Sequence, residues 1–329
     1  MSNDLTFCKM PLDRASHLRK NSAWLAGKVS SNDSCFYFYW QNKFLYLEQK
    51  IFAFSKNEYP NASNVISIQS TKNNHHLTFL GLHMDTAHFV FDLSNMSEVE
   101  LEQWLQSIGQ NNEQRTAKFI DFRRSLSLLN AKQASILSYA KALIHWQQSA
   151  MFCGCCGNKT QSLDGGHRRQ CVNEQCQTEQ FPRTDPVVIM LVEYRPESGP
   201  AMCLLAEHHR TPEQVYSTLA GFVDPGESLN EAVSREVFEE VGINVAEVSF
   251  VDSQPWPFPN SLMLGFVARA TSTVINLEEE ELRSADWFTA EQLREFQEWG
   301  DDVDGPKLPR KESIARLLID SWCESQRSS

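Results

Sequence analysis

Long apolar runs are missing from this sequence. A helix that crosses a membrane needs about 20 consecutive apolar residues, and no such run occurs among the 329 residues. The N-terminal stretch MSNDLTFCKMPLDR also lacks the basic-then-apolar pattern of a secretory signal. We therefore expect a soluble, cytoplasmic protein without a membrane partner.

Positive charge is also scarce. The chain has 30 Lys and Arg against 42 Asp and Glu, which gives a formal net charge of -12. Proteins that hold a nucleic-acid backbone generally present a broad basic face, so general DNA binding is not expected. An acidic enzyme can still bind a phosphate-bearing ligand when bound divalent cations supply the local positive charge. The charge therefore excludes one class of binder and leaves nucleotide enzymes open.

Cysteine is rare outside one short stretch. Five of the nine cysteines lie between positions 153 and 176, and the other four are scattered. A secreted disulfide scaffold would be shorter and more evenly supplied with cysteine. The dense cluster therefore indicates a metal site.

The hydrophobic pattern divides the chain into parts of different character. Two aromatic, partly alternating stretches, 34–49 with Asn42 at a turn and 76–93, predict strands of an antiparallel sheet. Segments 97–108 and 114–130 predict helices. The predicted domains are an N-terminal mixed, β-rich domain (1–130), a linking helix (131–150), a cysteine-bearing module (151–182) and an α/β domain (183–329).

The last part of the chain alternates between two periods, one typical of strands and one of helices. The long segment before the cysteines, 131–148, is uninterrupted by Gly or Pro and predicts a further helix. No internal repeat is visible. From residue 183 onward the expected strands are 187–194, 202–209, 248–254 and 262–270, and the expected helices are 228–241, 290–297 and 311–325.

The cysteine cluster consists of two short cysteine turns separated by 14 residues. Such turns can place four thiolates at the corners of a tetrahedron around Zn²⁺. The predicted ligands are Cys153, Cys156, Cys171 and Cys176. Cys155 is an alternative to Cys156, but Gly157 directly after Cys156 favours the latter. Asp164–Gly166 suit a hairpin tip between the pairs. Four protein ligands close the coordination sphere, so we expect one structural zinc per chain.

A glutamate-rich helix is expected after the turn at Asp224–Gly226. Ser228 is the predicted N-cap, with Glu231 in the capping-box position, and Gly242 ends the helix. Glu236 and Glu240 are four residues apart and therefore share a face. Like charges on one face repel, which divalent cations such as Mg²⁺ or Mn²⁺ would relieve. On composition alone, a solvated acidic face is the alternative.

The spacing of this segment matches a complete pattern, G-x5-E-x7-R-E-U-x-E-E-x-G-U, where U is aliphatic. Its fixed positions here are Gly221, Glu227, Arg235, Glu236, Val237, Glu239, Glu240, Gly242 and Ile243. The pattern resembles the Nudix box. The resemblance implies an α/β/α sandwich that hydrolyses a nucleoside diphosphate linked to another moiety. It implies metal ligands at Glu236 and Glu240, a ligand or general base at Glu239, and an ion pair between Glu227 and Arg235.

A proline-rich aromatic loop, SQPWPFPNS, occupies residues 253–261. Prolines hold such a loop extended, and its rings could stack on a flat base; an ordinary turn is the alternative. A four-cysteine zinc ribbon, a Nudix box and this loop in that order resemble the NADH pyrophosphatase subfamily. Segments 12–20, 152–157 and 181–190 are similar to it as well.

That resemblance implies an NAD(H) diphosphatase that releases NMN(H) and AMP, acts also on NAD-capped RNA 5′ ends, and forms a homodimer. It implies two more metal ligands, the backbone carbonyl of Ala220 and the carboxylate of Glu281; the acidic run around Glu281 leaves its register open by one residue. Phe181 stands where many members have Tyr. The implied substrate-binding residues are Phe181, Gln254, Pro255, Trp256, Pro257, Phe258, Pro259, Asn260, Ser261 and Ala315. A catalytically silent nucleotide sensor or zinc-ribbon binding module is the rival hypothesis, but it would not need every metal carboxylate.

Overall fold

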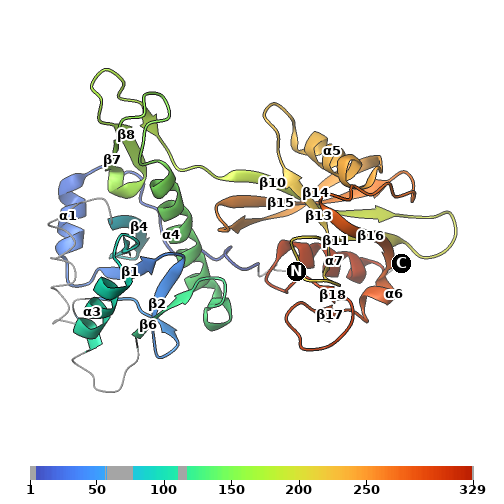
Figure 1. Ribbon diagram of the computed structural model, residues 1–329, viewed down its shortest axis with the longest axis horizontal. Helices are drawn as coiled ribbons and strands as arrows, with labels where there is room; N and C mark the ends of the chain where they lie inside the picture. Colours follow the sequence, from blue (N-terminus) through green and yellow to red (C-terminus); the bar gives the residue numbers. More distant parts are fainter. Residues whose placement is uncertain (1–4, 56, 58–76, 110–116, 328–329) are drawn as a thin grey trace. The chain divides into compact units, whose positions relative to one another are not determined.

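The computed structural model describes residues 5–55, 57, 77–109 and 117–327 (Figure 1). The chain forms two compact units. Unit 1 consists of Met1–Cys8, Thr184–Trp256 and Ser261–Ser329, and unit 2 of Lys9–Arg183 with Pro257–Asn260. Within the described residues, no helix is long and apolar enough to cross a membrane.

A seven-stranded mixed sheet forms the centre of unit 1. Its central strand, β10 (Asp185–Tyr194), runs parallel to β15 (Ser261–Ala270) and antiparallel to β11 (Met202–His208) and β13 (Leu219–Phe222). The outer strands are β12 (Tyr216–Ser217), β14 (Val245–Trp256) and β16 (Leu282–Thr289).

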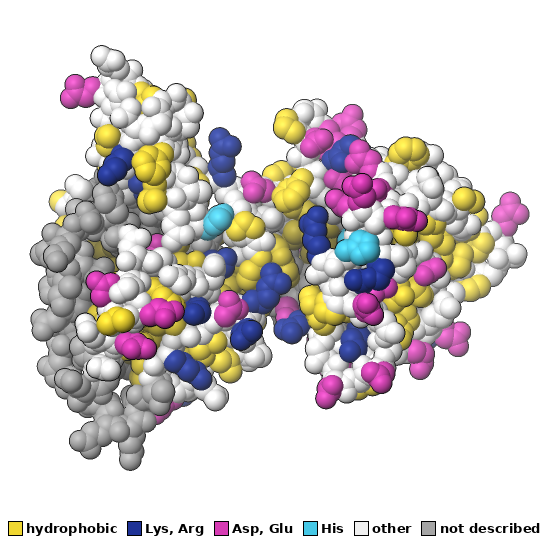
Figure 2. All heavy atoms as spheres, viewed as in Figure 1, with side chains coloured by type: hydrophobic (Ala, Val, Ile, Leu, Met, Phe, Trp, Pro, Cys, Tyr) yellow, Lys and Arg dark blue, Asp and Glu magenta, His cyan; other side chains and the backbone are white. Residues whose placement is uncertain are grey.

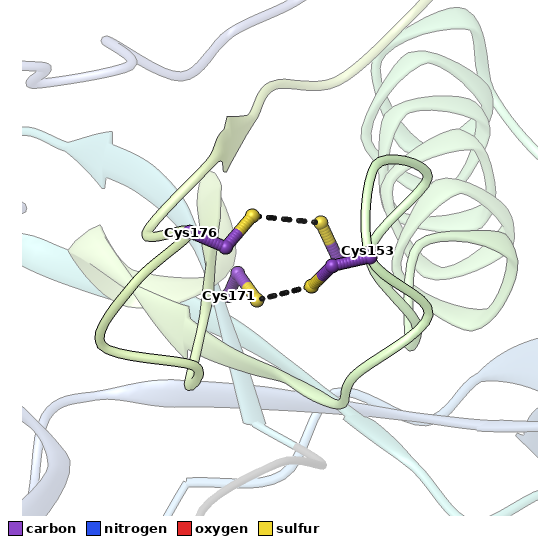
Figure 3. A group of neighbouring side chains, drawn as sticks. Cys153, Cys171 and Cys176 are labelled. Atoms are coloured by element: carbon purple, nitrogen blue, oxygen red, sulfur yellow. Dashed lines mark hydrogen bonds between the residues drawn. The ribbon is translucent and has the colours of Figure 1, made fainter.

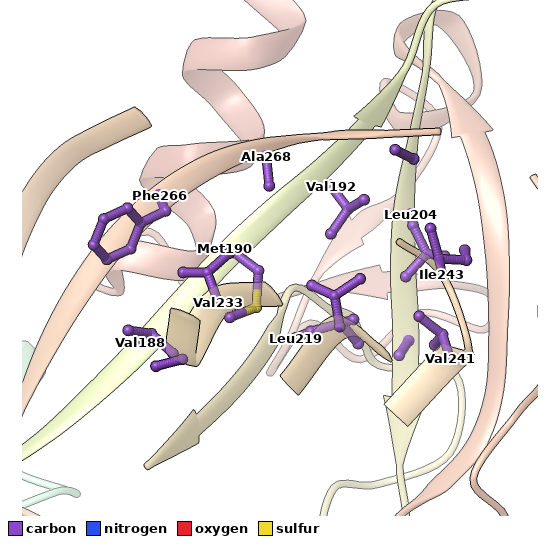
Figure 4. Packing of buried hydrophobic residues seen from close by; sticks show 14 of the residues in the cluster. Val188, Met190, Val192, Leu204, Leu219, Val233, Val241, Ile243, Phe266 and Ala268 are labelled. Atoms are coloured by element: carbon purple, nitrogen blue, oxygen red, sulfur yellow. The ribbon is translucent and has the colours of Figure 1, made fainter. Parts of the chain in front are cut away.

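Helices cover both faces of this sheet because β10 is apolar on both sides. Successive side chains of a strand point to opposite faces. Val188, Met190 and Val192 pack with α5 (Leu229–Val241) in the cluster shown in Figure 4. Ile189 and Leu191 pack instead with α7 (Ile314–Ser325). The predicted α/β/α sandwich is confirmed. The remaining elements are α6 (Ala290–Leu293), β17 (Gln297–Glu298) and β18 (Lys307–Leu308).

Unit 2 is built on a six-stranded sheet filled with aromatic side chains. Its strands are β1 (Cys35–Trp40), β2 (Lys43–Leu47), β3 (Lys50–Ile51), β4 (Leu77–His83), β5 (Thr86–Asp92) and β6 (Ala117–Asp121). Its helices are α1 (Ser22–Ser30), α3 (Glu98–Gly109) and α4 (Ala131–Ser149). Phe36 stacks on Phe89 and Phe38 on Phe91 inside this core, so ring packing holds β1 against β5.

A small three-stranded sheet carries the cysteines. It comprises β7 (Thr160–Leu163), β8 (Arg168–Cys171) and β9 (Glu179–Gln180), with Asp164–Gly166 at the predicted hairpin tip. His167 Nε2 lies 2.7 Å from the Phe79 carbonyl oxygen of β4, and Gln147 of α4 donates to the Gly166 carbonyl at 2.8 Å. The cysteine module is therefore packed on the same unit as the aromatic sheet.

Three sequence-based predictions of secondary structure are wrong. β1 and β5 pair in parallel, so the aromatic sheet is mixed and not purely antiparallel. Within 114–130, residues 114–116 lie outside the described residues, and the rest forms β6 and a 3₁₀ turn at Leu126–Leu128. The helix expected at 290–297 stops after Leu293, because Phe296 packs instead against Phe288 and Tyr216. In each case contacts with distant segments outweigh local propensity.

The other expected elements are present with small shifts of their ends, although the first residue of 76–93 lies outside the described part. The prediction of 131–148 corresponds to α4, and that of 311–325 to α7. β16 was not predicted. It pairs with β11 on one side only, and charged side chains typical of edge strands conceal its alternation.

Candidate active site and metal centre

The caps of α5 are those that the sequence predicts. Ser228 accepts a hydrogen bond from the Glu231 N–H, and the Glu231 carboxylate accepts one from the Ser228 N–H. Gly242 adopts the left-handed conformation at φ 69° and closes the other end. Capping satisfies backbone donors that would otherwise lack partners. The glutamates of α5 therefore project from a helix with well-defined ends.

Arg235 connects one carboxylate that precedes this helix with two that lie on it. It donates to both oxygens of Glu227, at 2.6 and 3.1 Å, and from Nη1 to Glu236 and Glu239, each at 2.9 Å. A further bond reaches the Phe222 carbonyl at 2.8 Å. The hydrogen bonds from Arg235 and from the Asp224 N–H lower the pKa of Glu227. The structure thus contains the ion pair between Glu227 and Arg235, which also orients Glu236.

Gly221 lies directly beneath the Glu236 carboxylate. A Cβ atom built on Gly221 would fall only 1.8 Å from the Glu236 Cδ. Gly221 and Ala220 are neighbours on β13, where Ala220 pairs with Ile189 of β10. The main chain of Ala220 is therefore held by the sheet one residue from the point where the Glu236 carboxylate meets β13. Gly221 is one of the fixed positions of the sequence pattern. The Glu236 carboxylate explains why, because it leaves no room for a side chain at residue 221.

We expect Gly221→Ala to displace the Glu236 carboxylate, because the methyl group of the new alanine and the Glu236 side chain cannot occupy the same space. A misplacement of about 1 Å can cost roughly 100-fold in rate, so we expect a loss of about that size in turnover. Gly27→Ala is the control, since nothing lies within 4 Å of the Cβ it would add. Steady-state kinetics of both variants test the prediction, and equal activities would contradict it.

Glu240 is the most deeply buried carboxylate of α5, with 5% of its surface exposed. Its Oε2 atom has no hydrogen-bond partner among the residues that the structure describes. Burial, reinforced by the charges of Glu236, Glu281 and Glu239, raises the pKa of Glu240 to about 8. A buried carboxylate among like charges is unfavourable unless a cation compensates it. The donor set is of the hard oxygen type that Mg²⁺ and Mn²⁺ prefer, so these residues fit such an ion.

Glu281 joins the site through the loop that precedes β16. The Glu278 N–H donates to the Glu240 carbonyl and the Asn276 N–H to that of Val241, both at 2.9 Å. These bonds fold the acidic loop onto the end of α5. Glu281 accordingly contributes to raising the pKa of both Glu236 and Glu240, although its own side chain is 56% exposed. The charge of Glu281 thus acts on both Glu236 and Glu240.

Acidic side chains gather over α5 in the space-filling view (Figure 2). They are nevertheless more widely spaced than the cysteines. Over the described ranges, only the four cysteines form a group of three or more metal-ligating side chains with all ligand atoms within 4.8 Å. This fits Mg²⁺, which usually keeps several waters and binds through one or two carboxylates plus substrate phosphates.

The raised pKa of Glu240 predicts that, after Mg²⁺ and Mn²⁺ are removed by dialysis, the free energy of unfolding decreases as the pH rises. Its ordinary value is 4.5 and its folded value about 8, so the folded state binds the proton more tightly. The contribution of Glu240 to the free energy of unfolding is fully present below pH 4.5 and is lost as the pH rises through 8. We expect Glu240→Gln to unfold at a higher temperature than wild type at pH 8, with the gap closing toward pH 5. Calorimetry across this range tests it, and a gap independent of pH would refute it.

The four cysteines predicted to bind zinc lie together (Figure 3). The Cys153 and Cys176 sulfurs are 3.7 Å apart, and those of Cys156 and Cys171 are 3.4 Å apart. A tetrahedron with Zn–S bonds of about 2.3 Å has edges of about 3.8 Å, whereas a disulfide would bring sulfurs to about 2.05 Å. The spacing and the soft thiolate donor set fit one Zn²⁺.

Main-chain N–H groups prepare two of these sulfurs for the thiolate form. The Asn158 N–H is the main cause that lowers the pKa of Cys156 to about 6, and the Cys155 N–H lowers the pKa of Cys153. Cys155 contributes its backbone and lies outside the sulfur group. The structure therefore groups Cys156, and not Cys155, with the other three.

The aromatic loop is divided between the two units. In unit 1, Gln254 is fully buried; its amide donates to the carbonyls of Thr6 and Glu312, and its oxygen accepts the Ile314 N–H. These three bonds commit its side chain to holding the start of α7. Trp256 is half-buried and packs edge-on against Phe7. The Gln254 side chain thus ties this part of the loop to the start of α7.

In unit 2, Pro257–Asn260 pack on α4 and on the end of β6. Lys141 donates to the Pro257 carbonyl at 2.8 Å, and Phe258 stacks on Phe122. The sequence analysis missed Lys141. Its signal was a lysine among the apolar positions of an otherwise regular helix. The remaining predicted substrate residues differ in exposure: Pro255, Pro259 and Phe181 are exposed, Asn260 and Ser261 are half-buried, and Ala315 is buried in the α7 cluster.

Comparison with known proteins assigns families to both units. Residues 184–308 match the NUDIX domain family, and residues 33–146 match the NADH pyrophosphatase-like rudimentary NUDIX domain. The strand pairing agrees with that second description. The order β2-β1-β5-β4 in unit 2 repeats β11-β10-β15-β14 in unit 1, with one parallel pair at the centre of each.

Individual relatives in other organisms extend this similarity. NAD-capped RNA hydrolase NUDT12 of Homo sapiens is 32% identical over 96% of this chain and 72% of its own length. NAD-capped RNA hydrolase NudC of Pseudomonas aeruginosa is 43% identical over 58% of this chain and 62% of its own. A solved NUDIX hydrolase from Nitrosomonas europaea aligns at a TM-score of 0.41 and 18% identity, covering 54% of this chain and 93% of that one.

Carboxylates on one helix can hold a divalent cation, and such an ion can activate water for the hydrolysis of a phosphate ester. The chain belongs to the Nudix family, in the branch that carries the NADH pyrophosphatase-like rudimentary domain.

Proposed function

We propose that this protein hydrolyses the pyrophosphate of NADH and NAD⁺, releasing NMN(H) and AMP. The observation that carries the proposal is the buried Glu240 carboxylate with Glu236 and Glu281 beside it, in a Nudix chain whose relatives are named NAD-capped RNA hydrolases. Such a set suits a divalent cation facing a diphosphate.

The ions in this proposal are Mg²⁺ or Mn²⁺, held by Glu236, Glu240, Glu281 and the Ala220 carbonyl. When bound, they would neutralise the charge that develops on the phosphate oxygens. The protein's own contribution is positioning. Arg235 orients Glu236 and, through Glu227, holds the turn before α5. The caps of α5 keep all three helix glutamates in register.

Glu239 is our candidate general base. It is 58% exposed, and one of its oxygens accepts the bond from Arg235. Its other oxygen can accept a proton from the attacking water. The water oxygen then bonds to one phosphorus, the bond from that phosphorus to the bridging oxygen breaks, and the bridging oxygen leaves with the second phosphate. The atoms balance as one water consumed for two monophosphates released.

The same reaction at the 5′ end of NAD-capped RNA forms part of the proposal, because the relatives' names refer to that substrate. It requires no different chemistry, since the bond broken is the same pyrophosphate. The ratio of kcat/KM on NADH to kcat/KM on a short NAD-capped RNA would rank the two substrates.

The deciding experiment is incubation with NADH and Mg²⁺ or Mn²⁺, with products identified by mass spectrometry. We expect NMNH and AMP in equal amounts, and one ¹⁸O atom in one of them when the reaction runs in labelled water. The rival hypothesis, a silent nucleotide sensor or zinc-ribbon binding module, instead predicts a thermal shift with NADH and no AMP. Absence of AMP with both metals would overturn the proposal.

The finer features of the proposal are one structural Zn²⁺ per chain, a homodimer and a cytoplasmic location. The zinc is supported by the tetrahedral spacing of four sulfurs. Light scattering coupled to gel filtration tests the dimer.

A further inference from the structure

Unit 2 contains a pocket of about 420 Å³ in which basic and aromatic side chains converge. It is built from the β1–β2 turn, the end of β6, helix α4 and the tip of the aromatic loop. Its lining residues are Asn42, Asp121, Phe122, Arg123, Lys141, His145, Phe258 and Pro259. All of them belong to unit 2. None belongs to the carboxylate set on α5 or to the cysteine group.

The key residue is Lys141, which is only 6% exposed. Its ammonium donates to the Pro257 carbonyl at 2.8 Å. An ammonium has three donors, and apart from the Phe258 ring, whose centre lies 5.3 Å from Nζ, no other acceptor for it is found in the described part of the chain. Burial lowers the pKa of Lys141, Asp121 raises it, and Arg123 lowers it, so both charges act on the ammonium. A buried cation with unused donors at the wall of a pocket favours an anionic occupant.

Arg123 adds a second positive charge. Its side chain is exposed and its guanidinium carbon lies 4.2 Å from the centre of the Phe258 ring, an attractive cation–π contact. In the described ranges it forms no ion pair. Phe258 is half-buried and stacks on Phe122 at 5.8 Å. The pocket thus presents guanidinium donors, and the Phe258 ring holds the guanidinium beside the buried ammonium of Lys141.

One carboxylate also lines the pocket. Asp121 accepts the Arg124 N–H at 3.1 Å through one oxygen. Against it stand Lys141 and Arg123, with His145 as a third nitrogen-bearing side chain. The lining is therefore net positive at neutral pH, in a chain whose net charge is -12. A concentration of positive charge that runs against the overall balance points to a local anionic ligand.

We propose that this pocket binds a nucleotide phosphate, with Lys141 and Arg123 as its donors. Two sources share this chemistry: the phosphomonoester of AMP and a phosphodiester of an RNA chain. Because Phe258 and Pro259 belong to the aromatic loop, an occupant would contact that loop directly. The relation of this pocket to the substrate rests on the proposed function. Binding of a nucleotide to the pocket can nevertheless be measured separately from the hydrolysis of NADH.

The test is direct binding to the full-length, zinc-loaded protein without added Mg²⁺ or Mn²⁺. Fluorescence anisotropy with a labelled, uncapped five-nucleotide oligoadenylate gives the RNA affinity, and competition with AMP gives the affinity for the mononucleotide. Arg123→Ala is compared with Arg124→Ala. Arg124 is the matched control, since it is adjacent, equally exposed and does not line the pocket. Both exposed substitutions should leave the unfolding temperature unchanged.

We expect Arg123→Ala to weaken binding about fivefold or more relative to Arg124→Ala, and Arg123→Glu to weaken it further. A loss of affinity that is confined to the oligonucleotide identifies the phosphodiester as the ligand. In that case the slope of log K against log salt concentration should become shallower by about 0.7, the value for one lost phosphate contact on a single strand. An equal loss for AMP identifies the monoester. If both arginine variants bind each probe as wild type does, the proposal is overturned, whether or not the enzyme cleaves NADH.

Discussion

Replacing Glu240 by Gln should abolish most of the turnover of NADH. The change keeps the size of the side chain and removes the carboxylate charge that is proposed to hold Mg²⁺ or Mn²⁺. Transition-state stabilisation by such an ion amounts to several kcal/mol, and each 1.36 kcal/mol corresponds to a factor of ten. We therefore expect kcat to fall at least about 100-fold at saturating metal. Initial rates of AMP release over a range of Mg²⁺ concentrations measure this.

The matched control is Glu247→Gln in the same unit. Glu247 is 65% exposed and pairs with Arg269 at the surface, an interaction of roughly 0–1 kcal/mol. Its kcat should stay near that of wild type. Near-wild-type turnover of Glu240→Gln would contradict the assignment of Glu240. A loss of turnover caused by unfolding is recognisable, because the metal-free Gln variant is expected to be the more stable protein at pH 8.

Loss of one buried cysteine from the metal group should destabilise unit 2 more than any single substitution on its surface. Cys171→Ser removes a sulfur atom that is buried in the same group as that of Cys153. Structural zinc sites contribute apparent binding free energies of about 10–16 kcal/mol at pH 7, which is comparable to the whole stability of a domain. We expect the variant to lose its zinc and to have an unfolding temperature more than about 10 °C below that of wild type. Elemental analysis and calorimetry measure both.

Cys155→Ser is the control for this substitution, because Cys155 is exposed and its sulfur lies outside the group. That variant should keep one zinc per chain and the unfolding temperature of wild type. A Cys171→Ser protein that retains one tightly held zinc would show that the four sulfurs are not the ligand set. A chelator strong enough to remove zinc should reproduce the Cys171→Ser result in the wild-type chain.

The sequence by itself determined those features that depend on neighbouring residues. The ends of α5 follow from Ser228, Glu231 and Gly242, because caps are formed within one turn of the helix. The cysteine group follows from two short turns and a hairpin for the same reason. The central strand β10 follows from its continuous apolar run, and the resemblance of the box to Nudix hydrolases implied the α/β/α sandwich around it.

Only the tertiary structure decided features that depend on segments far apart in the chain. β6 is a strand because β2 pairs with it, although the sequence analysis predicted a helix over the whole segment 114–130. Gln254 is buried because its partners come from Thr6, Glu312 and Ile314. Lys141 acquires a role because Pro257, more than a hundred residues later, accepts its hydrogen bond. Local periodicity contains no information on such partners, since their contacts form only when distant elements pack together.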